Sequence, residues 1–587
     1  MTSPDMASDR STVKQLKELF VSGLSGGSIQ EINIVTIVAL SSYAAWCALQ
    51  TRFSFFSAPR HSPTPSLPSL LVDFLLNWVI LLLSITVYAP HPFVFNLLIL
   101  APVVIVTLSF PSVISVRQRT AHVVTKRRER LKQSRPSSYL TPHDTVSVSD
   151  VSNHLSSEPR SNGIGQAPDS SLLPSQSFQS SNSHDSISSP LDLSSSSSAS
   201  SPNSSLSLDS YIPKKSFLTN YRGGMMVITC IAILAVDFRI FPRRFAKVET
   251  WGTSLMDLGV GSFVFSMGLV SARGHLKDRF LRQSLSLPQS VWRSIRQATS
   301  VLLLGLIRLV LVKAIGYHEH TSEYGVHWNF FMTLGFLPPF VTALNFLLPY
   351  ISSSALSLGV GILYQVLLDF TPLTRFILTA PRTGIISQNK EGIFSFFGYL
   401  SIFLAGQTAG FYTLPSTPRH IKLPFINKLA EPGLTASNPL AASRRAMLVY
   451  LVVAGLSHAA LFQVCIKGFK MNVSRRIANL PYVLWVTSYN LLYILMYLLV
   501  EVLFFPVPDA PSAELSYDEM VPWGLEAINK NGLAIFLLAN VLTGLVNMAV
   551  NTLEVRNLQA LALLLMYSGV LAVAVGAFRL RNWHIRI

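Results

Sequence analysis

Apolar runs of about twenty residues recur along the chain, and they constrain its fold more than any other feature. A run of this length crosses the hydrocarbon core of a bilayer as a helix. Half of the 587 residues are hydrophobic and only 13% are charged, roughly half the charge of an average soluble protein. Because helices satisfy their own backbone hydrogen bonds in lipid, the sequence predicts an all-α, polytopic transmembrane helical bundle.

The apolar runs predict about thirteen membrane spans. Two places fit this count least well, namely the short link after residue 88 and the Pro338-Pro339 pair inside one span. A membrane helix tolerates proline where neighbouring groups satisfy the freed carbonyls. The predicted spans are 31–49, 70–88, 92–110, 223–238, 254–272, 297–316, 328–349, 352–370, 393–411, 446–464, 479–505, 531–551 and 556–577.

Residues 134–213 have a different composition, rich in Ser with Pro, Asn and Asp. They show no apolar periodicity, so we expect a disordered loop. The predicted organisation follows from this loop. It comprises a polar lead-in at 1–30, spans one to three with the start of a basic loop at 31–133, the Ser-rich loop at 134–213, and spans four to thirteen with their polar links at 214–587.

The basic residues predict the orientation of the chain. The net charge is +17, and the densest basic cluster is Lys126-Arg-Arg-Glu-Arg-Leu-Lys132. Positive loops favour the cytosolic side, so the N-terminus is expected on the luminal or external side and the C-terminus in the cytosol. These residues lie in loops between apolar runs, where they meet lipid headgroups rather than nucleic acid. No metal-ligand spacing and no nucleotide-binding loop occur.

The stretch from Asp237 to Gly252 places a cluster of ionisable side chains between two predicted spans. Such groups near a bilayer are costly, which makes them candidates for function. Asp237 and Lys247 lie about 15 Å apart along a straight helix, but Pro242 forbids one and allows the chain to fold back. A carboxylate beside a lysine is suited to act as a general base and oxyanion stabiliser. A loop solvated by headgroup phosphates explains the same residues equally well.

Two further polar motifs precede predicted spans on the same side. His327, in Tyr324-Gly-Val-His-Trp-Asn329, is either a base for acyl transfer or a neighbour of the interfacial anchor Trp328. Asn389-Lys390-Glu391 is either a helix cap or a polar grip on a sugar or phosphate. Intramembrane amides also recur, and they either join helices or line a cavity: Asn490, Asn540, Asn547 and Asn551.

In their order along the chain, these motifs resemble one known family. They are Asp237-Phe-Arg-Ile-Phe-Pro-Arg-Arg-Phe-Ala-Lys247 with Glu249-Thr-Trp-Gly and Met256-Asp-Leu-Gly, then Tyr324-Gly-Val-His-Trp-Asn-Phe-Phe, then Asn389-Lys-Glu-Gly392 with Gly398-Tyr399. The chain resembles the GPI-anchor inositol acyltransferases, the fungal GPI-anchored wall-protein transfer family and its animal counterpart. The resemblance covers nearly the whole chain except 134–213.

The resemblance implies a reaction in the endoplasmic reticulum membrane, at its luminal face. A fatty acyl group, usually palmitoyl, passes from acyl-CoA to the inositol 2-hydroxyl of glucosaminyl-phosphatidylinositol. No cofactor and no metal are implied, since acyl-CoA is a co-substrate. The family's essential aspartate and lysine match Asp237 and Lys247. We expect Asp237 to act as the base, and Lys247 either to polarise the thioester carbonyl or to orient Asp237.

Other residues are candidates for substrate binding. Arg239, Arg243 and Arg244 are suited to hold the phosphates of CoA or lipid. His327, Asn329, Asn389, Lys390 and Glu391 are second-rank candidates for the pocket. Three other functions compete with this interpretation: a lipid or small-molecule transporter, a histidine-dependent membrane acyltransferase that uses His327 on another acceptor, and a non-catalytic scaffold.

Overall fold

The computed structural model describes residues 20, 22–57, 65–117, 120, 208–282, 286–315, 322–416, 439–507 and 516–583. Within these ranges the chain is helical and forms no strand, apart from one isolated bridge between Gly26 and Thr253. Thirteen helices of the described residues are long and apolar enough to cross a membrane. The predicted all-α bundle of thirteen spans is therefore confirmed.

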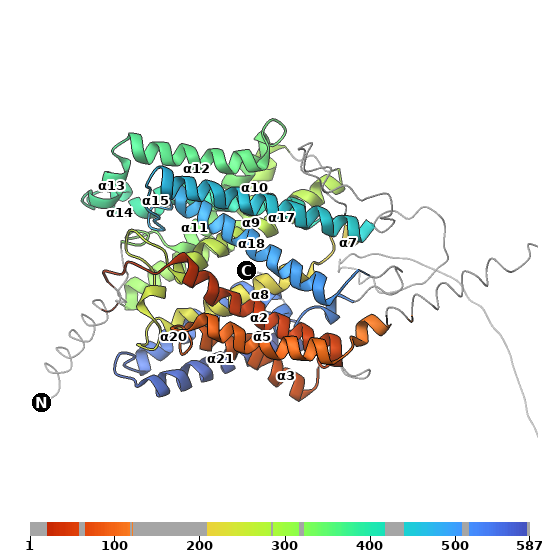
Figure 1. Cartoon of the computed structure of the whole chain (residues 1–587). Coiled ribbons are helices and arrows are strands. Elements are labelled where there is room, and N and C mark those ends of the chain that lie inside the picture. The colour runs from red at the N-terminus through yellow and green to blue at the C-terminus, as the bar shows by residue number, and fades with distance from the viewer. Residues whose placement is uncertain are drawn as a thin grey trace, which may run out of the picture. The chain divides into compact units, whose positions relative to one another are not determined.

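The helices of the bundle lie side by side with their long axes in a broadly common direction (Figure 1). In chain order the longer elements are α2 (Ile29–Phe53), α3 (Leu67–Phe74) continued by η1 (Leu75–Val79) and α4 (Ile80–Ile85), α5 (Pro92–Ser109), α8 (Ser216–Ala235), α9 (Leu255–Phe280), α10 (Leu287–Ile315), α11 (Phe330–Leu344), α12 (Ser353–Phe370), α15 (Lys390–Thr413), α17 (Pro439–Gln463), α18 (Leu480–Phe504), α20 (Gly532–Ala549) and α21 (Asn557–Leu580). Shorter helices include α7 (Leu208–Tyr211), α13 (Leu373–Thr379), α14 (Ile385–Gln388) and α19 (Trp523–Lys530).

Several helices begin earlier than the apolar runs that predicted them. Helix α8 begins at Ser216 rather than near 223, because its first turns carry polar side chains that are buried between helices. Asn220 donates a hydrogen bond to the carbonyl of Met520 (3.2 Å), and the Tyr221 hydroxyl donates to Asn490 Oδ1 (2.6 Å). A polar side chain with a partner in the bundle continues a span that hydropathy alone truncates.

The core of the bundle is centred on α15, the most completely buried of the thirteen helices. Helices α15 and α9 approach so closely that a Cβ at Gly406 would lie 2.1 Å from the carbonyl oxygen of Phe265. In the same contact, a Cβ at Gly268 would lie 2.1 Å from the carbonyl oxygen of Phe403. Small residues allow this kind of backbone approach in membranes.

Five polar segments meet at one end of the bundle, the end of α13 and α14 in Figure 1, with α7 at the other end. The segments are 22–28, 236–254, 322–329, 380–390 and 469–479. Backbone hydrogen bonds join them, including Gly27 N–H to Thr253 O (2.8 Å), Gly252 N–H to Val473 O (2.9 Å) and Val326 N–H to Gln388 O (3.0 Å). The motifs singled out in the sequence are thus gathered in one place.

Two predicted regions fall mostly outside the described residues. The chain divides into two compact units, Met1–Arg127 with Leu206–Ile587, and Arg128–Ser205. The second unit, which contains most of the predicted Ser-rich loop, lies outside the described residues, as does most of the predicted lead-in at 1–30. Only the end of the loop is described, and there Leu208–Tyr211 forms α7.

Candidate active site

A cavity of about 1280 Å³ lies inside the bundle, next to the segment that links α8 and α9. Side chains of α8, α9, α10, α18 and α20 form its walls, and most of them are apolar, such as Ile228, Phe263 and Phe536. The ionisable side chains that line it come mainly from the polar segments at one end: Asp237, Lys247, Glu249, Arg308, Glu323 and Arg475. The cavity therefore combines a charged end with a long apolar body.

The cavity is long and has an open side. Its lining residues on α8 extend from Tyr221 past the end of the helix, which corresponds to about 21 Å of helix rise up to Ala235. On the side between α10 and α20, the lining includes exposed apolar residues, among them Leu311 and Met548. Exposed apolar side chains on membrane helices face lipid, so lipid-facing residues border the cavity on this side.

Asp237 lies just beyond the end of α8, at the charged end of the cavity. Its Oδ2 accepts a hydrogen bond from Asn547 Nδ2 on α20 (2.7 Å). The turn that holds Asp237 is clamped by Arg243, which donates to the carbonyls of Val236 (2.7 Å) and Phe238 (3.1 Å). The carbonyl of Val236 is one that the end of the helix leaves without a backbone partner, whereas that of Phe238 also accepts the N–H of Phe241 (3.2 Å).

The charge of Arg243 is retained in this position. Burial lowers the pKa of Arg243 to about 10, a shift that the negative charge of Asp237 partly opposes. A guanidinium with that pKa is still protonated at neutral pH. Arg243 therefore stabilises, as a cation, the turn in which Asp237 lies.

Lys247 lines the same cavity, because the chain turns back through Pro242 and the short helix η2 (Arg243–Phe245). Its ammonium forms an ion pair with Glu323, with Nζ 2.6 Å from Oε1. The same oxygen of Glu323 lies 3.4 Å from Arg475 NH1, and Arg475 Nε lies 2.6 Å from Asp257 Oδ1. A row of alternating charges therefore connects the cavity to the first turn of α9.

The ionisation of this row follows from its contacts. Burial raises the pKa of Glu323, but the positive charges of Lys247 and Arg475 outweigh burial, and the net pKa is lowered to about 2. Burial lowers the pKa of Arg475, but Glu323 and Asp257 outweigh it, and the net pKa is raised. Both groups are thus charged at neutral pH, and Glu323 is a weak base.

The segment 22–28 covers the charged end of the cavity. Gly26 forms the isolated bridge with Thr253, and its φ of +82° suits glycine. A Cβ at Gly26 would lie 2.1 Å from the carbonyl oxygen of Thr253. The Gly23 N–H donates to Glu249 Oε2 (2.9 Å), so Glu249 ties this cover to the link between α8 and α9.

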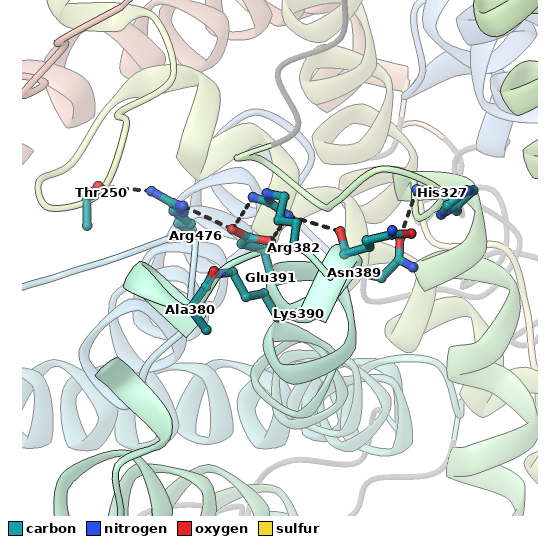
Figure 2. Close-up of polar contacts among 9 residues, drawn as sticks. Thr250, His327, Ala380, Arg382, Asn389, Lys390, Glu391 and Arg476 are labelled. Carbon is teal, nitrogen blue, oxygen red and sulfur yellow. Dashed lines mark hydrogen bonds and ion pairs between the residues drawn. The ribbon is translucent and has the colours of Figure 1, made fainter. Parts of the chain in front are cut away.

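The Asn389-Lys390-Glu391 motif forms a different cluster, which does not line the cavity among the described residues (Figure 2). Glu391 is completely buried and pairs with Arg382 (2.6 Å) and Arg476 (3.0 Å). Asn389 Oδ1 accepts the backbone N–H groups of His327 (2.8 Å) and Trp328 (2.9 Å). Lys390 Nζ donates to the carbonyl of Ala380 (2.5 Å). His327 joins this cluster through its backbone N–H.

The remaining predicted residues have varied positions. Asn329 lines the cavity but also caps α11, accepting the N–H groups of Phe331 and Met332. Arg244 pairs with Glu31 (2.7 Å) and donates to the carbonyl of Ala89. Arg239 is exposed and does not line the cavity. The structure therefore brings Asp237, Lys247 and Asn329 into the cavity and places the other candidates around it.

Three residues of the site were not predicted from the sequence: Glu323, Arg475 and Asn547 as the partner of Asp237. Glu323 directly precedes the Tyr324 motif, and Arg475 opens a predicted span, so both were visible as charges at membrane edges. Asn547 was one of four intramembrane amides with two possible roles. The structure shows that Asn490, Asn540 and Asn547 line the cavity.

The sequence matches the family model described as GWT1 over residues 13–149 and 170–578. The chain belongs to the GWT1 family. It is similar to the GPI-anchored wall transfer protein 1 of Gibberella zeae, with 42% identity over 97% of this chain and 99% of the relative. The protein of that name from Aspergillus fumigatus is 42% identical over 95% of this chain and 96% of the relative. The one from Saccharomyces cerevisiae is 38% identical over 96% and 97%.

Membership of the GWT1 family confirms the resemblance found in the motifs. The matched ranges include every helix that lines the cavity and all five polar segments around its charged end. The unmatched residues 150–169 fall within the Ser-rich stretch 134–213. The cavity therefore lies in the matched part of the chain, and residues 150–169 of the Ser-rich stretch lie outside it.

Proposed function

We propose that this protein is an acyltransferase of GPI-anchor biosynthesis. It transfers a fatty acyl group, usually palmitoyl, from acyl-CoA to the inositol 2-hydroxyl of glucosaminyl-phosphatidylinositol. Membership of the GWT1 family and the names of the relatives support the GPI part of this proposal. The observation that carries the acyl-transfer part is the cavity, which places a carboxylate and a lysine ammonium at the charged end of a long apolar chamber.

The apolar body of the cavity suits a fatty acyl chain. Its walls extend about 21 Å along α8, and each methylene group removed from water contributes about 0.8 kcal/mol to binding. The side between α10 and α20 suits the lipid acceptor, because its own acyl chains remain in the bilayer while its headgroup enters the cavity. Both substrates then meet at Asp237 and Lys247.

The proposed reaction is a direct transfer. Asp237 accepts the proton of the inositol hydroxyl, and the oxygen attacks the thioester carbonyl. The Lys247 ammonium stabilises the oxyanion that forms. The tetrahedral intermediate then expels the CoA thiolate, which takes the proton from Asp237, so the C–O bond replaces the C–S bond. Asn547 holds one oxygen of Asp237, and Asp237 lines the cavity in which the substrate is proposed to bind.

The predicted contacts with substrate phosphates stay predictions. Arg239 is two residues after Asp237 in the sequence, and its side chain is exposed. Of the three arginines it therefore has the most room for a phosphate. Arg243 and Arg244 already have partners within the protein. For His327, Asn389, Lys390 and Glu391, the surrounding contacts favour a role in the scaffold.

The proposed location is the endoplasmic reticulum membrane, with the N-terminus in the lumen and the C-terminus in the cytosol. The support comes from the distribution of basic residues. Arg279 lies at the end of α9, Arg444 near the start of α17 and Arg579 at the end of α21. Positive residues favour the cytosolic side, which leaves the charged end of the cavity on the luminal side.

The test is an acylation assay on membranes supplied with labelled palmitoyl-CoA and glucosaminyl-phosphatidylinositol. We expect an alkali-resistant acylated product, and we expect Asp237→Asn and Lys247→Ala to lower its rate at least about 100-fold, as removal of a general base or oxyanion donor does. Asp518→Asn and Lys277→Ala are matched controls at exposed positions, with rates near that of the wild type.

Two outcomes contradict the proposal. If folded Asp237→Asn or Lys247→Ala keeps near-normal activity, the assigned residues are wrong. If the wild type moves lipid across the membrane but yields no acylated product, the protein is a transporter instead.

A further inference from the structure

We propose that Glu323 is a positioning residue that holds the Lys247 ammonium at the reacting carbonyl. This inference rests on the proposed function, because it deepens the role of Lys247 in that reaction. Glu323 Oε1 lies 2.6 Å from Lys247 Nζ, and both residues line the cavity. The two residues come from different polar segments, so the ion pair fixes the lysine relative to a second wall of the cavity.

Lys247 needs such a partner. Its side chain is 39% exposed, and a free lysine side chain has rotamer freedom that costs up to about 2 kcal/mol to remove. An oxyanion donor is effective only when it is already in place as charge develops. The ion pair with Glu323 fixes the Lys247 side chain in place before the substrate binds.

Glu323 is itself fixed by a rigid support. Its Oε1 lies 3.4 Å from Arg475 NH1, and Arg475 is bound to Asp257 at 2.6 Å. Arg475 and Asp257 are almost completely buried, with side-chain exposures of 4% and 1%. The row therefore runs from a buried anchor in α9, through Arg475 and Glu323, to the half-exposed Lys247.

The surroundings of Glu323 separate its role from that of Asp237. Glu323 faces the cations Lys247 and Arg475, with Arg308 further away, and these charges hold its pKa at about 2 in spite of burial. A carboxylate with so low a pKa accepts a proton poorly at neutral pH. Asp237 accepts a hydrogen bond from the neutral amide of Asn547, and the cation near it, Arg243, donates its hydrogen bonds to backbone carbonyls. Of the two carboxylates, Asp237 is the base and Glu323 the holder of the lysine.

The experiment measures kcat and KM of Glu323→Gln, Glu323→Asp and Lys247→Ala in the acylation assay, with the double variant of Glu323→Gln and Lys247→Ala. We expect Glu323→Gln to lower kcat about 30-fold with KM for palmitoyl-CoA within about twofold, since only oxyanion stabilisation is weakened. Glu323→Asp keeps the charge and recovers part of the rate. In the double variant, loss of Glu323 adds nothing to the loss of Lys247.

Glu519→Gln is the matched control, because Glu519 also pairs with an arginine, Arg117 at 2.9 Å, but does not line the cavity. We expect unchanged kinetics for this variant. Absence of product with the wild type overturns the proposed function. Two results with an active wild type overturn only the role of Glu323. One is a wild-type kcat in Glu323→Gln, and the other is a loss of rate in the double variant that equals the product of the two single losses. If Glu323→Gln does not fold, the kcat and KM of Glu323→Asp decide the matter.

Discussion

Two charged clusters lie at the same end of the bundle, and they differ in what their charges contact. The cavity cluster consists of Asp237, Lys247, Glu323 and Arg475, all of which line the cavity. The closed cluster consists of Arg382, Asn389, Lys390, Glu391 and Arg476 (Figure 2). In the closed cluster the carboxylate is completely buried and held by two arginines. In the cavity cluster the side chain of Lys247, which lines the cavity, is 39% exposed.

The difference separates two uses of charge at a membrane surface. Buried charges that pair with one another join segments together, because breaking one such contact leaves a buried charge without a partner. Charges that keep a face toward a cavity remain available to a substrate. The closed cluster joins the segments 322–329, 380–390 and 469–479 around the cavity, and the cavity cluster acts inside it.

The largest effect that we expect from this difference is at Glu391. We expect Glu391→Gln to destabilise the protein by about 3 to 5 kcal/mol, because Arg382 and Arg476 lose the carboxylate that neutralises them. The measurement is the midpoint of thermal unfolding in detergent, together with the yield of folded protein. The rate of acylation per folded molecule should stay within about threefold of the wild type.

Glu519→Gln serves as the control for Glu391→Gln, since its ion pair with Arg117 is exposed and surface pairs contribute about 0 to 1 kcal/mol. A Glu391→Gln variant that folds normally and loses activity would move Glu391 into the substrate-binding group. The two clusters would then share one function, and the contrast drawn between them would be wrong.

A smaller effect is expected at Asn389. Its side chain accepts the backbone N–H groups of His327 and Trp328, and an unsatisfied buried N–H costs about 1 to 3 kcal/mol. We expect Asn389→Ala to lower the free energy of unfolding by about 2 kcal/mol, measured by thermal unfolding. Asn389→Asp keeps the acceptor oxygen and should recover most of this loss, which a role in gripping a sugar would not predict.

The sequence was sufficient for the fold and the family, and it indicated two residues that the structure places on one cavity. Runs of about twenty apolar residues identified all thirteen spans, because the bilayer imposes their length. Motif order identified the family and led to Asp237 and Lys247. Pro242 indicated that the chain between them leaves the helix, and the structure places both residues on one cavity.

The sequence was not sufficient for the partners of each charge. Lys247 and Glu323 are far apart in the chain, and nothing local to either residue indicates the ion pair between them. The same holds for Asp237 and Asn547, which come together only because α8 and α20 pack side by side. Local spacing suggested that the Asn389 motif caps a helix or grips a ligand, whereas its main contacts are with distant segments.

The smallest predicted effect is at His327, and it tests the rival histidine-dependent mechanism. His327 is bound to Asn389 through its backbone N–H, a contact that substitution of the side chain leaves in place. The residue does not line the cavity, although Tyr324 and Trp328 on either side of it do. We therefore expect His327→Ala to change the acylation rate less than about threefold and the unfolding midpoint little. A histidine that acts as general base contributes 10²-fold or more, so a loss of that size in folded His327→Ala, with Asp237→Asn still active, would transfer the catalytic role from the cavity cluster to the edge of the closed one.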